Sequence, residues 1–353
     1  MNRRHALQRL GFFSLLGPSL AAQTRESAGF LHRHPAFDLH CHPGMFLQRG
    51  AAEYAGDQAP AKTISEMREG GLAAGFFSVV ADARLLSRDA KGIAVNRAFA
   101  AGEAWADCER QLTTFDDLVK REKIGFATSV RQMEAFRKRG QLAAFLSCEG
   151  GDCLEGNLGR LEQIYQRGVR SLQLVHYAQN TLGDLQTQPP AYNGLSGFGR
   201  DVVRRMNRLG MVVDAAHAAF AAVKATVDST SAPILLSHSH LQSESSPHPR
   251  LITVEHARLV ASTGGVIGAW PSGFANRTFA DFVDQTMRLV DAVGVDHVGL
   301  GTDMDGNFQP VFSSYRQLPD WIAALGAKGL SEGDVAKIAG GNALRVLKQV
   351  LKA

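Results

Sequence analysis

The sequence has little cysteine and no clustering of charge. Four cysteines in 353 residues are too few for a disulfide scaffold, and none has Cys-x-x-Cys spacing, so we interpret them as buried thiols among which one disulfide could form. Charged residues make up 20% of the chain, without a block of one sign. This pattern argues against a nucleic-acid groove or an acidic tail, and nucleic acid is not an expected partner.

Long hydrophobic runs are also absent. After the first thirty residues no segment is apolar over the length of a membrane helix, and the C-terminal LRVLKQVLKA lacks the hydrophobic tail of a lipid anchor. The mature chain is therefore expected to have no membrane span and no lipid anchor. With 45% hydrophobic residues it can still bury a large core.

The N-terminal residues have the layout of an export signal. Three arginines precede an apolar run at residues 10–20, and small residues follow it. This layout predicts a signal peptide at residues 1–22 and hence a periplasmic or secreted protein. The Arg3–Arg4 pair resembles a twin-arginine signal, and an ordinary Sec signal with an incidental arginine pair is the alternative.

Eight short apolar runs of the kind that form strands follow this segment, most of them separated by stretches with helical periodicity. Such alternation builds a parallel sheet, and eight units in a chain of this length favour an α/β fold, a closed (β/α)8 TIM barrel. The runs lie at residues 36–42, 75–81, 143–149, 171–176, 210–217, 232–240, 264–270 and 297–303.

The connecting segments indicate one domain. The largest excursion between runs, residues 83–140, looks mostly helical. Because no internal repeat and no Pro-, Gly- or Ser-rich linker is present, residues 23–353 are expected to form a single domain. Further helices are expected at residues 158–170, 198–210, 254–264 and 282–294.

Six of the eight runs end in side chains that can bind a metal ion or a proton. Barrel enzymes place their chemistry at the C-terminal ends of the strands, so these side chains are expected to meet there. Within the first run, two histidines that are two residues apart share one face of an extended strand. The candidates are His40, His42, Glu149, His176, His217, His238 and Asp303.

This set of donors fits two metal ions better than one. Four histidines and a carboxylate suit zinc or a similar borderline ion, but they are too many for a single open zinc site. Two Zn²⁺ ions that share Glu149 account for them, with His40 and His42 on one ion and His217 and His238 on the other. A hydroxide between the ions would attack a polarised carbonyl, which predicts hydrolysis of an amide or ester.

The sequence also resembles the membrane (renal) dipeptidase family of zinc peptidases, barrel enzymes of the metal-dependent hydrolase type. The resemblance implies an exported dinuclear zinc dipeptidase that acts on small dipeptides through a metal-bridging hydroxide, and it allows a homodimer because family members often dimerise. The matching stretches occur in the family's order from about residue 37 to the C-terminus: DLHCHP, SCEGGDCLEG, GVRSLQLVHYAQN, GLSGFGRDVVRRMNRLGMVVDAAH, LLSHSH, HPR, STGGVIG, GLGTDMDG and GGNALRVL.

The resemblance implies roles for individual side chains. The five donors assigned above to the two ions match the family's ligand positions, with Glu149 as the bridge. His176 would stabilise the tetrahedral intermediate at the scissile carbonyl. Arg250 would clamp the C-terminal carboxylate of the dipeptide with its paired donors. Asp303 would hold the free ammonium group and carry a proton to the leaving amine, so Glu149, His176 and Asp303 are the catalytic candidates.

Two positions depart from the family pattern. His42 stands where the family usually has aspartate, which removes one negative ligand and affects metal affinity and substrate preference more than reaction class. Arg250 is followed by Leu251, where the family often has asparagine. Because His-x-His is commoner in other metal-dependent barrel hydrolases, hydrolysis of another small amide or a lactone is the alternative. A periplasmic binding protein without turnover is a third, weaker hypothesis.

The remaining conspicuous residues receive structural interpretations. Asp305 is expected to brace the loop after the eighth run, and Cys41 and Cys148 are expected to face the helix layer. The other histidines are expected in loops or helices, with His240 near enough to the second ion to support a ligand. These other histidines are His240, His248, His256 and His297.

Overall fold

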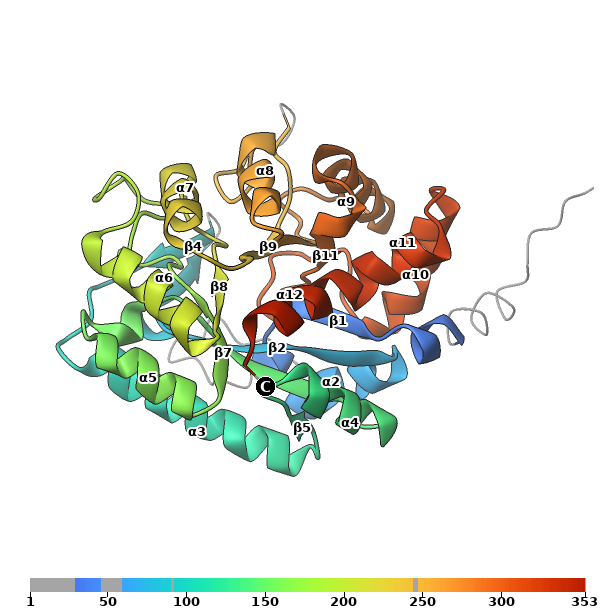
Figure 1. Ribbon diagram of the computed structural model, residues 1–353, viewed down its shortest axis with the longest axis horizontal. Helices are drawn as coiled ribbons and strands as arrows, with labels where there is room; N and C mark the ends of the chain where they lie inside the picture. Colours follow the sequence, from blue (N-terminus) through green and yellow to red (C-terminus); the bar gives the residue numbers. More distant parts are fainter. Residues whose placement is uncertain (1–28, 46–58, 90–91, 244–246, 353) are drawn as a thin grey trace, which may run out of the picture.

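The computed structural model describes residues 29–45, 59–89, 92–243 and 247–352, which form a parallel barrel surrounded by helices (Figure 1). The predicted (β/α)8 TIM barrel is therefore confirmed. The predicted signal peptide at residues 1–22 lies outside the described residues. No helix in the described ranges is long and apolar enough to cross a membrane.

Eight strands close the barrel in parallel pairs. Consecutive barrel strands are hydrogen-bonded neighbours, β2 pairs directly with β6, and β11 closes the ring against β1. The strands are β1 (Ala36–Cys41), β2 (Leu72–Val80), β6 (Ala143–Glu149), β7 (Val169–Gln173), β8 (Val212–Asp214), β9 (Leu235–Ser239), β10 (Val266–Ala269) and β11 (Val298–Leu300).

The helices cover the outside of the barrel. All four helices expected after the third strand are present, with similar bounds. Helix α6, for example, begins where the Ser196 side chain accepts the Gly199 N–H, and it ends at Gly210, whose φ of 81° favours glycine. The helices are α2 (Pro60–Glu69), α5 (Leu158–Gln166), α6 (Gly197–Leu209), α7 (Phe220–Ser229), α8 (Val254–Ser262), α9 (Phe279–Val293), α10 (Leu318–Ala327), α11 (Glu332–Ala336) and α12 (Asn342–Val350).

The excursion between β2 and β6, expected to be mostly helical, is helical only in part. It contains the helices α3 (Glu103–Arg121) and α4 (Val130–Lys138), but also an antiparallel hairpin and a two-residue strand, β5 (Gly125–Phe126). The hairpin strands are β3 (Leu86–Asp89) and β4 (Gly92–Val95). Neither LSRD nor GIAV alternates apolar and polar residues, so the period of two that predicts a strand is missing from both.

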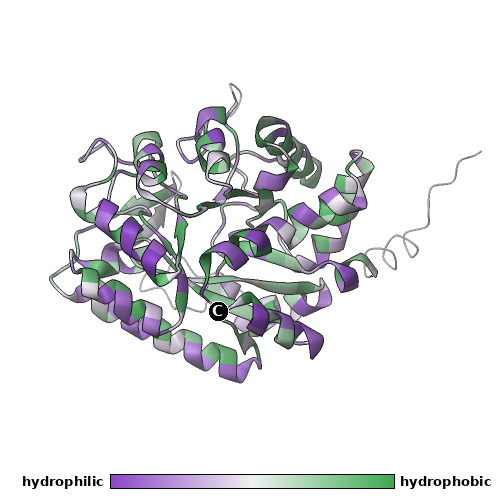
Figure 2. Ribbon diagram, in the orientation of Figure 1, coloured by the Kyte–Doolittle hydropathy of each residue, from purple (hydrophilic) through white to green (hydrophobic). Residues whose placement is uncertain are grey.

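The hydrophobic core has an inner and an outer part. Inside the barrel, the rings of Phe37, Phe76 and Phe145 pack within 5.9 Å of one another, and α12 covers this cluster with Leu347. A larger cluster lies between the strands and the helices. Figure 2 shows the corresponding pattern, with strands mostly hydrophobic and helices alternating between hydrophobic and hydrophilic residues. The inner cluster occupies the amino ends of the strands and leaves their carboxyl ends for polar groups.

Two irregularities in strand register turn additional side chains into the barrel. One lies in β1 between Asp38 and Cys41, and the other lies where β9 pairs with β10. At the second, the carbonyl oxygen of Ser237 comes so close to Gly268 and Gly301 that a Cβ on either would lie within 1.9 Å of it. Bulges of this kind change the direction of side chains beside active sites. The first irregularity contains His40 and the second contains His238, and both histidines lie at the barrel mouth.

Candidate metal centre and active site

Four histidine side chains converge on Glu149 at the carboxyl ends of the strands. Nε2 of His40 and Nε2 of His42 lie 3.3 Å from the two oxygens of Glu149. Nε2 of His217 and Nε2 of His238 lie 3.4 and 3.8 Å from Oε1 of the same carboxylate. The structure thus brings together all five ligand candidates, which come from four strands or the residues just after them.

The five side chains form two triads that share Glu149. Within each triad the nearest donor atoms lie within 4.8 Å of one another, and the paired histidine Nε2 atoms are 3.1 Å apart in both. All five residues are at most 3% exposed. Imidazole nitrogen and carboxylate oxygen, aimed at common points and withdrawn from water, are the donor set that two zinc-like ions require.

Hydrogen bonds at the far side of the rings orient two of these histidines. Nδ1 of His42 donates to the carbonyl oxygen of Ser78 at 2.8 Å, and Nδ1 of His238 lies 3.0 Å from the hydroxyl of Ser237. The first contact leaves the Nε2 lone pair of His42 for a ligand role. Nδ1 of His217 has no hydrogen-bond partner among the described residues, and its ring is instead packed against the rings of His176 and Tyr177, at 4.5 and 5.0 Å between centroids.

The two triads differ in their protonation. Burial opposes charge on His42, but Asp303 and Glu149 outweigh it and raise the pKa of His42 to about 9. Burial, reinforced by nearby positive groups, lowers the pKa of His217 and that of His238 well below their ordinary value. The second triad therefore presents neutral imidazoles at neutral pH, whereas an ion at the first triad has to displace a proton from His42.

Two buried aspartates that sequence reasoning missed hold the backbone that carries the ligands. Asp38 accepts the backbone N–H of His40 and of Thr302, both at 3.0 Å, and so links β1 to the segment after β11. Asp214 accepts the N–H of Ala216 and of Ser237 at 3.0 Å and links β8 to β9. The sequence did contain a signal for both aspartates, because each is a carboxylate inside an otherwise apolar strand, two or three residues before a candidate ligand.

A third missed residue, Asp82, positions His176. Asp82 Oδ1 lies 2.6 Å from Nδ1 of His176, and its Oδ2 accepts the backbone N–H of Tyr177 and Ala178. Nε2 of His176 in turn lies 3.3 Å from Oε1 of Glu149. Because Asp82 is fully buried just after β2, it fixes the imidazole with its Nε2 directed at the Glu149 carboxylate.

Arg250 and Asp303 lie beside this cluster with opposite charges. Arg250 is 1% exposed, and its Nη1 donates to Gln186, while Nε and Nη2 have no hydrogen-bond partner among the described residues. Its guanidinium lies over the ring of Trp270, at 5.2 Å from the centroid. Asp303 accepts from Nε1 of Trp270 at 3.3 Å, and its other oxygen is 3.4 Å from Nε2 of His42. Two unused donors on a buried cation suit an incoming anion.

The other predicted residues take structural positions. Asp305 braces the loop after β11, as expected, by accepting from the Gly44 N–H and from the hydroxyl of Thr63 in the first turn of α2. His240 does not support a ligand, because its ring packs against Phe282 and neither ring nitrogen has a hydrogen-bond partner in the described structure. Burial lowers the pKa of His240 to about 3, so it is a neutral core residue.

The remaining histidines and two cysteines also occupy structural positions. His248 stacks on Phe274 at 3.7 Å, His256 completes the cap of α8, and His297 donates to the Gly265 carbonyl. Cys41 and Cys148 belong to the outer hydrophobic cluster, so they face the helix layer as predicted.

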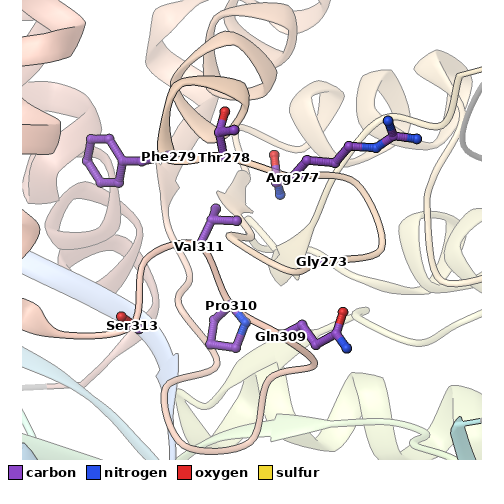
Figure 3. A pocket seen from close by; sticks show the side chains of 9 residues that line it. Gly273, Arg277, Thr278, Phe279, Gln309, Pro310, Val311 and Ser313 are labelled. Atoms are coloured by element: carbon purple, nitrogen blue, oxygen red, sulfur yellow. The ribbon is translucent and has the colours of Figure 1, made fainter. Parts of the chain in front are cut away.

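A cavity of about 700 Å³ lies apart from the histidine cluster (Figure 3). It is bordered by residues 273–279 and 309–313, on the loops that follow β10 and β11, and backbone hydrogen bonds between Gly273 and Phe308 and between Val311 and Pro271 join these loops. None of the ligand candidates lines it. The candidate site therefore rests on the convergence of side chains rather than on this cavity.

Comparison with known proteins adds three findings. A model of the membrane dipeptidase family, peptidase family M19, matches residues 24–353. Dipeptidase verJ of Clonostachys rogersoniana is 30% identical over 251 residues, covering 68% of this chain and 64% of that protein. Dipeptidase tcpJ of Claviceps purpurea is 34% identical over 229 residues, covering 62% of this chain and 53% of that protein. The chain thus matches little more than half to nearly two thirds of the length of these curated relatives.

Solved structures share the fold. An amidohydrolase from Pseudomonas aeruginosa aligns with a TM-score of 0.75 at 21% identity, covering 92% of this chain and 99% of that one. A metallo peptidase from Rhodobacter sphaeroides, liganded with a phosphinate mimic of the dipeptide L-Ala-D-Ala, aligns with a TM-score of 0.75 at 21% identity. The alignment covers 90% of this chain and 99% of that one.

Proposed function

Because the chain belongs to the membrane dipeptidase family, we propose that it is a metal-dependent hydrolase that cleaves the peptide bond of dipeptides. The observation that carries this proposal is the convergence of four histidines on Glu149, flanked by a buried arginine and a buried aspartate. An ion-binding cluster alone would fit many hydrolases. The two flanking charges add recognition of a small substrate that has both a free carboxylate and a free amine.

The ions in this proposal are two Zn²⁺. His40, His42 and Glu149 would hold one, and Glu149, His217 and His238 the other. When bound, the ions would supply Lewis-acid chemistry by lowering the pKa of a water molecule and polarising the carbonyl that the water attacks. The donor set supports this assignment, because the two triads already point their nearest donor atoms at common centres.

Arg250 and Asp303 would orient the dipeptide by its two ends. Nε and Nη2 of Arg250, which are buried without a partner in the described structure, would donate to the C-terminal carboxylate. Asp303 would hold the ammonium group at the other end. Because longer peptides lack a carboxylate one residue after the scissile bond, this arrangement favours dipeptides.

His176 and Asp303 would handle the charge and the proton of the reaction. Asp82 holds Nδ1 of His176, so that Nε2 can donate to the oxygen of the scissile carbonyl as negative charge develops there. Asp303, with one oxygen 3.4 Å from His42, lies close enough to the metal-binding residues to accept a proton from the attacking water. It would then deliver that proton to the leaving amine.

A second candidate is hydrolysis of another small amide or of a lactone. It is favoured by one observation, the histidine at position 42 in the first metal triad, where the family usually has aspartate. The two candidates differ in their need for the flanking charges, because a lactone presents no ammonium group to Asp303.

We also propose that the protein is exported and acts in the periplasm or outside the cell. The support is the arginine-rich, then apolar layout of residues 1–22. A homodimer remains a proposal on the basis of family resemblance.

The test is metal analysis of the purified protein together with a panel of dipeptides, N-acetyl dipeptides, dipeptide amides and small lactones. We expect close to two zinc ions per chain and cleavage of dipeptides with both ends free. Rapid cleavage of lactones with no preference for free termini would favour the second candidate. One ion per chain with full activity would remove the bridging role of Glu149.

A further inference from the structure

A second cluster of donor atoms lies on the outer side of the strand that carries Glu149. The Sγ atoms of Cys108, Cys148 and Cys153 lie within 4.8 Å of one another, and each residue is at most 1% exposed. They come from three elements, α3, β6 and the short helix η4 (Asp152–Leu154). The proposed peptide hydrolysis uses none of these thiols.

The surroundings of the cluster are apolar. All three cysteines belong to the outer hydrophobic core cluster, and the nearby acid Asp107 is occupied by Arg84 and Arg110, at 2.7 and 2.8 Å. Three thiolates around a divalent ion would carry a net charge of minus one, and around a monovalent ion minus two. Burying such a charge in an apolar core is costly, whereas a disulfide is neutral.

The contacts between α3 and η4 favour one pair of cysteines. Helix α3 packs on η4, and the Ala104 N–H of α3 donates at 3.2 Å to Oε1 of Glu155, the residue that follows η4. Cys108 is one helical turn beyond Ala104 and so faces the same neighbour. Cys148, in contrast, donates its thiol hydrogen to the carbonyl of Gly150 on its own strand end, at 3.5 Å.

From this geometry we infer that Cys108 and Cys153 form a disulfide that ties α3 to η4, while Cys148 remains a thiol. The bond forms by thiol–disulfide exchange with a disulfide oxidant, small or protein-borne. The two cysteines give up two electrons and two protons, and the oxidant is reduced to two thiols. Export, as proposed above, would bring the chain into contact with such oxidants.

Hydrogen bonds within the cluster change the pKa of the Cys108 thiol in the folded protein. The Cys148 and Cys153 side chains hold the pKa of the Cys108 thiol well below its ordinary value. Because the three thiols are buried in the folded protein, the oxidant would react with them during folding, before α3 covers the cluster, and either cysteine of the pair can attack it first while the other resolves the mixed disulfide. Because the finished bond lies under α3, reductants should reach it only after local opening.

The bond would restrain the backbone next to the metal-binding carboxylate. Only residues 150–152 separate Glu149 from Cys153, and η4 packs on α3. Closing the long chain segment from residue 108 to residue 153 restricts the unfolded chain, so the main effect falls on stability.

The test counts thiols in the full chain. Unfolded, reduced protein is refolded with zinc in a glutathione redox buffer, quenched in acid, and alkylated in denaturant before intact-mass measurement and peptide mapping. We expect two alkylated cysteines without reductant, Cys41 and Cys148, and four after reduction, with one cross-linked peptide joining Cys108 to Cys153. The oxidised protein should melt on the order of 5 °C higher than the reduced one.

Single variants provide matched controls. Cys41→Ser and Cys148→Ser should keep the cross-linked peptide and the oxidation-dependent rise in melting temperature. Cys108→Ser should lose both. Any of three results would overturn the inference. The first is four free thiols in refolded wild type, and the second is a cross-link that uses Cys41 or Cys148. The third is a copurifying soft metal ion whose binding requires all three cysteines. The wild-type count needs no variant, so it stands even if one variant fails to fold.

Discussion

Glu149 and Cys148 are neighbours on β6, yet they belong to two unlike clusters. Glu149 points into the barrel, where the four histidines proposed as ligands and His176 meet it at the mouth. Cys148 points outward into a group of three thiols that α3 covers. The alternation of side chains along a strand produces this separation, because consecutive residues face opposite sides of the sheet.

The comparison shows how one strand can keep two donor chemistries apart. Nitrogen and oxygen donors suit a catalytic zinc site, whereas thiolates bind soft ions and zinc more tightly and would compete for them. The inner cluster also retains unused hydrogen-bonding groups on Arg250, while the sulfur cluster contacts mostly apolar neighbours. The inner side is therefore suited to a ligand, and the outer side to a covalent bond.

The largest effect should follow from changing the inner residue of β6. Glu149→Gln removes the charge that both triads share, so we expect fewer than two ions per chain and a loss of dipeptide hydrolysis on the order of a thousandfold or more. Metal content and kcat/KM measure this. Folding and the number of free thiols should be unchanged, and a variant with two ions and normal turnover would disprove the bridge.

The second-largest effect concerns Arg250, the buried cation beside the histidine cluster. If Arg250 binds the substrate carboxylate, amidating the dipeptide should lower kcat/KM of the wild type by about 30- to 1,000-fold, as expected for a lost charge-assisted contact of about 2–4 kcal/mol. In Arg250→Ala the same amidation should have little further effect. Equal losses in both proteins would place the carboxylate elsewhere. N-acetylation paired with Asp303→Asn should be non-additive in the same way.

Asp82 should have an intermediate effect, because it acts through His176. We expect Asp82→Asn to lower kcat about 10- to 100-fold with little change in KM, as for residues that orient a site side chain. Asp184→Asn is the matched control, since Asp184 is also a buried carboxylate that accepts backbone N–H groups, from Ala191 and Gly194 among others. A KM effect as large as the kcat effect would contradict a role confined to positioning His176.

Replacing His42 with aspartate should change the pH dependence of ion binding more than the rate of dipeptide hydrolysis. With a pKa raised to about 9, His42 holds a proton at pH 7 that an ion must displace. Ion affinity at the first triad should therefore rise about tenfold per pH unit from pH 7 to about pH 9 in the wild type. His42→Asp should bind two ions with a flatter dependence, and His42→Ala should lose one. Zinc titrations across this pH range would show the slopes, and identical slopes would sink the idea.

The smallest effect is expected on the outer face of β6. Cys148→Ser should keep dipeptide hydrolysis within about threefold of the wild type and cost about 1 kcal/mol of unfolding free energy, a usual value for a mild core change. Kinetics and denaturant unfolding would check both. Activity that falls as far as in Glu149→Gln would show that the two faces are not independent.

Much of the site could be predicted from the sequence because its donors follow apolar strands. His40, Glu149 and His238 each stand at or next to a strand end, and the barrel brings such ends together. Asp82 was missed because the second apolar run was taken to end at residue 81, although Asp82 follows it directly. Applying the same strand-end reasoning to this run would have found it.

Other features left no local pattern to read. His240 was expected beside the second ion, but the register irregularity at β9 turns His238 inward and leaves His240 against Phe282 in the helix layer. The strands of the hairpin β3–β4 lack an alternation of apolar and polar residues, and the hairpin interrupts a region that looked mostly helical. For His240 the outcome depends on the register of β9, because a shift of one residue moves side chains to the other face of the sheet.

The sequence alone determined which donor types the protein has and at which strand ends they stand, because strand alternation and helical periodicity act over a few neighbouring residues. Only the tertiary structure decided which donors meet. Barrel closure set residues as distant as Asp38 and Thr302 side by side, and the packing of α3 on η4 gathered three thiols from separate elements. Those contacts depend on how the whole barrel closes and packs, so no local pattern in the sequence encodes them.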